Sequence, residues 1–275
     1  FGGAYDEALP DRRPKYGALN HLGRATGASP RFGSARGRLP GGRFMTLLAI
    51  DSTGPSLSVA IACEGKIVYE CFQRTGHTHS ERLMPMIDAA LQAQGIEPSQ
   101  LDALAVTVGP GSFTGVRIGV ETAKALCHAL EKPCVPVNAL EAIARGAGGF
   151  EGVICPMQDA RAGQVYAAAY WDGEKILPDG AMKLDEFLEA LPDEAACCFL
   201  GDGAQAHREA IAQAMGERAV FAQESDMNLR AANAALIACE RPETAVGWRE
   251  VAPYYLRKPQ AEREREAREA QGHAE

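Results

Sequence analysis

The pattern of apolar and polar positions divides the chain at Met45. Residues 1–44 show no hydrophobic period and are rich in Gly, Arg and Pro, which is typical of disordered segments. After Met45, short apolar runs alternate with turn residues at Gly54-Pro55 and Glu64-Gly65, and the short second turn predicts an antiparallel hairpin. The predicted strands are 46–51, 57–63 and 66–73. We therefore expect Met45 to be the natural start and residues 1–44 to be a disordered extension.

Helical periodicity follows this hairpin. Thr78 and Glu81, three residues apart, form the capping box expected at the start of a helix over 79–94. Strands and helices then alternate as far as the glycine cluster 146–149, which predicts a domain boundary. The predicted elements are strand 103–108, helix 114–130, strand 133–137 and helix 138–146. Three antiparallel strands followed by alternating helices and strands is the order of the ribonuclease-H-like unit of actin, Hsp70 and sugar kinases, an analogy of fold alone.

The second half of the chain repeats parts of this order. We expect strands 153–158, 164–171 and 197–201, helices 203–215 and 228–240, and a closing segment Val251–Arg257. The pattern predicts an α/β protein with the actin-like, ribonuclease-H-like two-lobed ATPase fold. Its expected parts are the extension 1–44, an N-terminal lobe 45–147, a second lobe 148–257 and a tail 258–275 in which Glu and Arg alternate.

Composition and charge restrict the function. No apolar run reaches the roughly 20 residues of a membrane helix, and the first residues lack the order of a secretory signal, so we expect a cytoplasmic protein without a membrane partner. The eight cysteines show no C-x-x-C motif, which favours buried thiols. Residues 1–44 carry eight basic and three acidic residues, about +5, which leaves about −13 of the total −8 for residues 45–275. An acidic body is a poor sole platform for RNA.

Three glycine-containing turns follow predicted strands. Glycine lets backbone N–H groups approach an anion, the following helix N-terminus adds partial positive charge, and Asp51 could hold a hydrated magnesium ion. No Rossmann fingerprint or P-loop is present, because Thr114 stands where the first needs Gly and Val116 where the second needs Lys. A degenerate phosphate site and simple sharp turns into helices both stay open. The turns are Asp51-Ser52-Thr53-Gly54, Gly109-Pro110-Gly111-Ser112-Phe113-Thr114-Gly115 and Gly201-Asp202-Gly203-Ala204.

The predicted helix 79–94 is apolar over a wide face. At 100° per residue its apolar positions span roughly 160°, more than the stripe of about 100° that covers one core. Two methionines within this face favour a subunit interface, and the alternative is a domain that wraps the helix more fully. The candidate interface residues are Leu83, Met84, Met86, Ile87 and Leu91.

Four segments together resemble the TsaB family, also called YeaZ. They are Leu48–Thr53, His79–Ile87, Gly109–Gly119 and Asp159–Tyr166, and the run Gly-Pro-Gly-Ser-Phe-Thr-Gly is the most specific of them. The resemblance extends from Met45 to about Arg257. It implies an actin-like fold and a role in forming N6-threonylcarbamoyladenosine in tRNAs that read codons starting with adenine.

The resemblance also implies partners. TsaB proteins pair with a homologous transferase subunit, TsaD, and a TsaE-type ATPase joins them, so we expect tRNA contact only through that complex and a homodimer when the chain is alone. TsaD-like proteins carry H-x-x-x-H on the helix after the strand that ends here at Val137. Ala139 and Ile143 stand at those two positions, and neither side chain can ligate a metal. We therefore expect a scaffold or activating subunit with no metal, no required cofactor and no catalytic residue, although ATP or ADP could still bind.

Three other functions stay open. A stand-alone nucleotide-dependent kinase or transferase of this fold needs intact phosphate turns, Asp51 for magnesium and a catalytic base. A metallopeptidase, an activity once suggested for relatives of the family, needs the missing His pair. Direct RNA binding is disfavoured by the acidic body. The roles of Asp159 and Arg161 stay unassigned.

Overall fold

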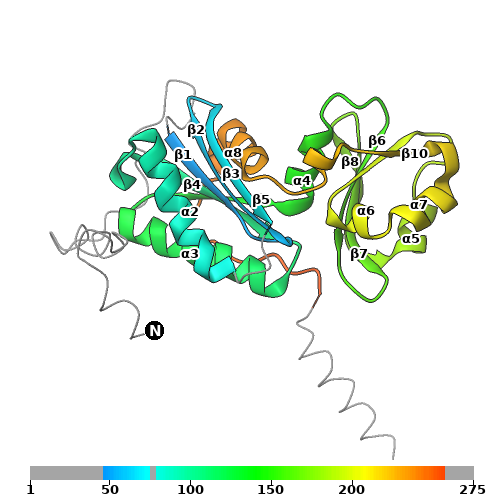
Figure 1. The fold of residues 1–275 in the computed structure, drawn as a ribbon, viewed down its shortest axis with the longest axis horizontal. Helices are drawn as coiled ribbons and strands as arrows, with labels where there is room; N and C mark the ends of the chain where they lie inside the picture. Colours follow the sequence, from blue (N-terminus) through cyan, green and yellow to red (C-terminus); the bar gives the residue numbers. More distant parts are fainter. Residues whose placement is uncertain (1–45, 75–78, 258–275) are drawn as a thin grey trace, which may run out of the picture.

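The computed structural model describes residues 46–74 and 79–257; the extension 1–44, Thr78 of the expected capping box and the tail 258–275 lie outside the described residues. A five-stranded sheet forms the first lobe in the order β3-β2-β1-β4-β5 (Figure 1). β1 pairs with β2, and β2 with β3, in antiparallel fashion, whereas β1–β4 and β4–β5 are parallel. The strands are β1 Thr46–Asp51, β2 Ser56–Cys63, β3 Lys66–Arg74, β4 Ala103–Gly109 and β5 Cys134–Asn138.

Burial explains which strands take the centre of this sheet. Almost every residue of β1 and β4 is buried, as expected for near-continuous apolar runs that are covered on both faces. β3 alternates between exposed and half-buried residues, which suits an edge strand. Glu64 and Gly65 have φ values of 52° and 78°, the left-handed backbone that a tight hairpin turn between β2 and β3 requires.

Helices cover both faces of the first sheet (Figure 1). α2 (His79–Gln94) and α3 (Phe113–Leu130) pack on one face, and α8 (Ala231–Glu240) packs on the other against β1 and β2. The expected boundaries placed the α8 segment in the second lobe. The structure differs because the small residues on α8 close the core beside Ala49 and Ala60.

The second lobe repeats the strand order and directions of the first. Its sheet runs β8-β7-β6-β9-β10, with β6–β7 and β7–β8 antiparallel and β6–β9 and β9–β10 parallel. The expected helix 203–215 is divided at His207, and β8, α5 and β10 were not expected. The elements are β6 Val153–Asp159, β7 Gln164–Trp171, β8 Glu174–Lys183, α5 Leu184–Glu189, β9 Cys197–Leu200, α6 Asp202–Ala206, α7 Arg208–Met215 and β10 Ala219–Phe221.

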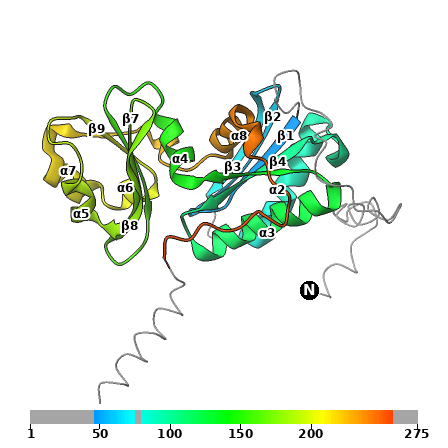
Figure 2. The same cartoon turned by 180° about the vertical axis from the view of Figure 1, so that it is seen from behind.

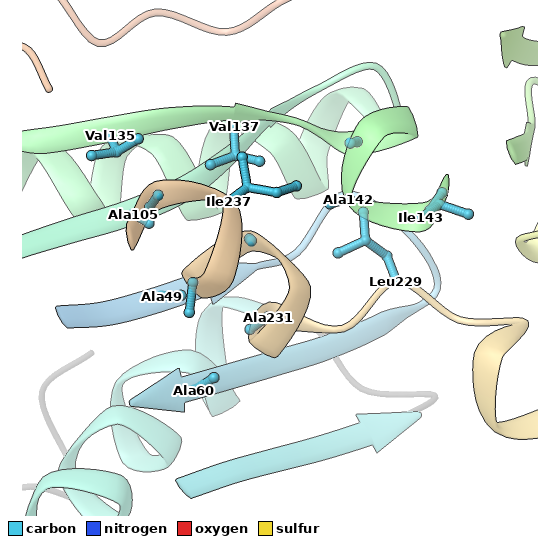
Figure 3. Packing of buried hydrophobic residues seen from close by; sticks show 14 of the residues in the cluster. Ala49, Ala60, Ala105, Val135, Val137, Ala142, Ile143, Leu229, Ala231 and Ile237 are labelled. Carbon is cyan, nitrogen blue, oxygen red and sulfur yellow. The ribbon is translucent and has the colours of Figure 1, made fainter. Parts of the chain in front are cut away.

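The chain crosses between the lobes twice. It leaves the first lobe through α4 (Ala139–Ala144) and returns after β10 into α8. Around α4, one buried cluster joins residues of the first sheet and α8 with Ala168, Tyr170 and Leu200 of the second lobe; Figure 3 shows the part beside α4 and α8. The last described segment, residues 251–257, runs along α3 toward the space between the lobes (Figure 2).

Two expectations from composition can be compared with this fold. Six of the eight cysteines are buried, whereas Cys63 and Cys71 are half-buried. Among the residues described, no helix combines the length and the apolar character that crossing a membrane requires.

Candidate site between the two lobes

Two of the glycine turns meet at one edge of the first sheet. β1 and β4 are parallel neighbours, so the turns that follow them emerge at the same end. The backbone N–H of Ser112 donates to the carbonyl of Thr53 at 2.7 Å, and the hydroxyl of Ser52 donates to the carbonyl of Gly115 at 2.8 Å. From the second lobe, the side-chain amide of Gln158 donates to the hydroxyl of Thr53 at 3.2 Å. The two turns therefore form one unit that faces the second lobe.

The third turn joins this unit through Gln158. Gly201 has a φ of 101°, a left-handed value that favours glycine, and it packs against the carbonyl of Met157. A side chain at Gly203 would place its Cβ 2.6 Å from the backbone carbon of Gln158. All three predicted turns thus gather where the two lobes meet, but Gly201 and Gly203 serve the close approach of α6 to β6.

The glycines of the second turn leave room for the chain itself. A Cβ at Gly111 would lie 2.5 Å from the carbonyl oxygen of Thr53, and one at Gly115 would overlap the carbonyl oxygen of Ser52. A Cβ at Gly109 would overlap the carbonyl oxygen of Tyr254. Because these spaces are filled and the N–H of Ser112 is already paired, the packing favours sharp turns over a phosphate cradle.

Asp51 is buried at the centre of the unit. Its Oδ1 accepts from the backbone N–H of Thr53 at 3.1 Å, from the Thr53 hydroxyl at 2.8 Å and from the Thr107 hydroxyl. Burial raises the pKa of Asp51, and the hydrogen bonds from Thr107 and Thr53 act in the opposite direction. The side chain of Thr53 therefore links Asp51 to Gln158, a contact between the lobes.

A second carboxyl, that of Asp202 in the other lobe, lies near enough to Asp51 to be affected by its charge. The pKa of Asp202 is raised to about 6, chiefly by burial; backbone hydrogen bonds lower it, and the charges of Asp159 and Asp51 act in the same direction as burial. Asp159 accepts a hydrogen bond from the backbone N–H of Arg161 at 2.8 Å, and its Oδ1 lies 4.0 Å from His207 Nε2. Asp159 therefore fixes the turn between β6 and β7, in which Arg161 has a φ of 63°.

Sequence reasoning missed Gln158 and the electrostatic role of Asp202. Asp202 lies inside the third predicted turn, where attention went to the flanking glycines. Gln158 immediately precedes Asp159 at the end of a strand and is only 2% exposed. The sequence alone does not show that this polar side chain is buried, because the neighbouring lobe covers it.

The two positions that the resemblance gives to the His pair of the transferase belong to the core of this chain. Ala139 is fully buried and Ile143 is 2% exposed, and both lie in the cluster around α4. Figure 3 shows Ile143 beside Ala142 on this helix. Their apolar side chains contribute to packing between α4 and its neighbours.

The predicted interface on α2 needs a correction. Leu83, Ile87 and Leu91 are buried in the core of the first lobe, so the prediction that they contact a partner was wrong. The apolar face is wide because α2 packs against β2, β3 and α3 together. Met84 and Met86 are half-buried and only partly covered by this core, which leaves them as the remaining interface candidates.

Two lobes with the same sheet order, joined around α4, define an actin-like α/β protein. Residues 73–265 match the family described as TsaD, tRNA N6-adenosine threonylcarbamoyltransferase. The chain is 34% identical over 223 residues to the tRNA threonylcarbamoyladenosine biosynthesis protein TsaB of Bacillus subtilis, which covers 79% of this chain and 96% of the relative. It is 36% identical over 140 residues to the Escherichia coli protein of the same name, covering 48% and 60% of the two chains.

A solved structure agrees with this assignment. YeaZ from Pseudomonas aeruginosa superposes with a TM-score of 0.65 at 30% identity, over 78% of this chain and all of that one. The chain belongs to the TsaB (YeaZ) family.

Proposed function

We propose that this protein is a non-catalytic subunit of the assembly that forms N6-threonylcarbamoyladenosine in tRNA. Its relatives are named for that biosynthesis, and the matching family profile is that of the transferase. The observation that carries the proposal is α4, where Ala139 and Ile143 fill the core at the positions that the resemblance gives to the transferase's His pair. A chain without these ligands assists the transfer instead of performing it.

The packing of the glycine turns supports a role that needs no nucleotide hydrolysis. The spaces beside Gly111 and Gly115 are occupied by the backbone of the Asp51–Gly54 turn, which opposes close approach of a polyphosphate. Residual binding of ATP or ADP is compatible with the proposal, whereas turnover of ATP by the purified protein alone is not. Such turnover would instead favour the stand-alone kinase or transferase, with Asp51 as its magnesium ligand.

The proposed partner surface is the outward side of α2 and α3. The two helices lie beside each other on one face of the first sheet (Figure 1). Pro85 and Ala89 are exposed one turn apart on α2, with the half-buried Met84 and Met86 beside them. Small exposed side chains let a partner helix approach closely, and methionine adapts to different surfaces.

We assign this surface to the TsaD-type transferase subunit in the cytoplasm and to a second copy when the protein is alone. A C2 dimer and a complex of two related folds can use matching helix pairs. A TsaE-type ATPase then joins the complex, and tRNA is contacted through the transferase because the chain itself is acidic, with a net charge of −8.

Charge placed on this surface is expected to separate the subunits. Ala89→Glu and Met84→Glu should each convert the homodimer to monomer and abolish pull-down of the TsaD-type subunit, because a buried unpaired charge is costly. Ala214→Glu on α7, also an exposed alanine of a helix, is the matched control and should leave both associations intact. Sedimentation, pull-down and thermal unfolding are measured together. A dimer that survives Ala89→Glu excludes this surface.

Reconstitution tests the proposed function itself. Purified TsaD-type and TsaE-type subunits, an activated threonylcarbamoyl donor and unmodified tRNA are incubated with and without this protein, and modified adenosine is measured by mass spectrometry. We expect modification only when this protein is present, and none when it replaces the TsaD-type subunit. Modified tRNA in the absence of the TsaD-type subunit would show that this chain is itself a transferase.

A further inference from the structure

The last described residues, Val251–Arg257, touch both lobes. We call this segment the C-terminal strap. Val251 is buried in the core of the first lobe, and the exposed Tyr254 and Tyr255 follow where the strap passes along α3 (Figure 2). The strap therefore begins as part of one lobe and continues beyond it.

The anchors on the first lobe are specific. The backbone N–H of Tyr254 donates to the carbonyl of Val108 at 2.7 Å, near the C-terminal end of the buried strand β4. The rings of Phe113 and Tyr255 stack with centroids 4.8 Å apart. Arg117 donates from Nε to the Tyr255 hydroxyl at 3.1 Å and places its guanidinium 4.2 Å from the centre of the Phe113 ring. These contacts fix the strap to α3.

The same segment also contacts the second lobe. Arg257 donates from Nη1 to the carbonyl of Ala160, in the turn between β6 and β7, at 3.2 Å. Burial, and after it the charge of the nearby Asp179 carboxylate on β8, raises the pKa of the Tyr254 phenol, which puts Asp179 beside this phenol. The strap thus connects α3 with β8 and with the β6–β7 turn.

Asp179 is itself held in place. Its Oδ2 accepts from the side-chain amide of Asn138, the residue before α4, at 2.6 Å, and its Oδ1 pairs with Lys175 at 2.6 Å. The Asp179 side chain is only 7% exposed. A buried carboxylate with several charged or polar partners forms a rigid attachment point for the strap.

Lobes that are joined at chain crossings can rotate about them. Here the crossings lie before β6 and after β10, and the buried cluster around α4 joins the lobes close to them. In addition, the side chains of Gln158 and Thr53, and those of Asn138 and Asp179, are hydrogen-bonded between the lobes. We propose that the C-terminal strap is a clamp that sets the angle between the two lobes, and that its attachments to Asp179 and Ala160 can open without unfolding either lobe. The clamp is independent of the function proposed above.

Residual dipolar couplings of the full chain test the clamp. Backbone amides of the two sheets report the orientation of each lobe in solution, and one alignment tensor is expected to fit both sheets of the unaltered protein. In the double variant Tyr254→Phe/Arg257→Ala the two second-lobe anchors are lost, and the lobes are expected to require two different tensors. Hydrogen exchange at the backbone amide of residue 254, which donates to Val108, is expected to rise about fivefold to tenfold, since a strap without its second-lobe anchors lifts from β4 more often.

The control is Arg249→Ala, an arginine just before the strap whose guanidinium lies over Trp248 of the first lobe. It should leave a single tensor. The single variants Tyr254→Phe and Arg257→Ala should each give intermediate behaviour, and unchanged amide shifts within each sheet confirm that the lobes stay folded. A single tensor for the double variant, with both sheets intact, overturns the clamp.

Discussion

Asp202 illustrates how a single carboxyl can cost stability at neutral pH. Its pKa is raised to about 6 by burial, above an unfolded value of 3.8. The folded protein therefore holds the proton more tightly than the unfolded chain does. The stabilisation from protonation is fully present below the unfolded pKa and is lost as the pH rises through about 6.

Replacing this carboxyl with its neutral amide should stabilise the fold at neutral pH. Asp202→Asn is expected to raise the free energy of unfolding at pH 7.5 by about 1–3 kcal/mol, and the gain should disappear below about pH 4, where the native carboxyl is also neutral. Urea unfolding between pH 4 and pH 8 measures this. Asp193→Asn, on an exposed loop, is the control and should show little change. A gain that does not depend on pH would contradict the role of the Asp202 charge.

The glycines of the three turns show what the sequence could and could not predict for single residues. Each of the three turns follows a strand, so the sequence places these glycines at sheet ends, and the structure brings the three turns together where the lobes meet. Their purpose could not be predicted, because glycine permits close approach by an anion or by another part of the chain alike. Only the positions of Ser52, Thr53 and Tyr254 distinguish the two cases.

Among the elements, α8 depends on the sheet for its first turn. The residue at its N-cap is Arg230, which makes no side-chain capping bond. Ser58 on β2 accepts from the N–H of Ala231 at 3.1 Å, and Glu70 on β3 accepts from the N–H of Ala232 at 3.2 Å and pairs with Arg230. Two strands thus satisfy backbone donors that the helix cannot satisfy itself.

Removing these acceptors should weaken the first lobe in a graded way. Glu70→Ala is expected to cost about 1–3 kcal/mol, because it leaves the half-buried N–H of Ala232 unpaired and Arg230 without its carboxylate partner. Glu70→Gln keeps an acceptor and should cost less. Ser80→Ala, at an exposed position of α2, serves as the control. Chemical denaturation monitored by circular dichroism gives the three values. If Glu70→Ala and Ser80→Ala have equal free energies of unfolding, the hydrogen bonds from α8 to the sheet do not contribute to stability.

The predictability of elements followed their length and burial. α2 occupies His79–Gln94, and β1 occupies Thr46–Asp51, as the periodicity predicted. β8 was not predicted because Pro178 and Gly180 within it are typical of a turn. An edge strand tolerates both residues. α5 and β10 are too short to show a period. The wide apolar face of α2 was interpreted as an interface because the sequence does not show how many elements of the same lobe pack around a helix.

At the scale of the whole molecule, the two sheets share one topology although their sequences show no obvious repeat. The strand order and directions are the same in both lobes, which the order of predicted elements indicated only in part. The glycine cluster 146–149 predicted a lobe boundary near residue 148, and the first strand of the second sheet begins at Val153. The return of α8 and the strap to the first lobe could not be predicted from the sequence, because nothing local in those segments indicates which sheet they cover.

Residues 1–44 should be dispensable for this architecture. They lack the apolar period needed to join a core, and their deletion is expected to change the melting temperature by less than about 2 °C and to leave partner binding intact. Differential scanning calorimetry and pull-down of the shortened chain provide the comparison. A drop of several degrees would place the true boundary before Met45.

The late position of α8 has a consequence for how the protein is made. α8 begins 93 residues after β5 ends, so a ribosome that adds about 5–20 residues per second needs roughly 5–20 s to supply it. During that interval the face of the first sheet beside Ala49 and Ala60 has no permanent cover. The nascent first lobe is therefore a natural client for chaperones, and the second lobe, whose elements are contiguous, is positioned to complete its fold first.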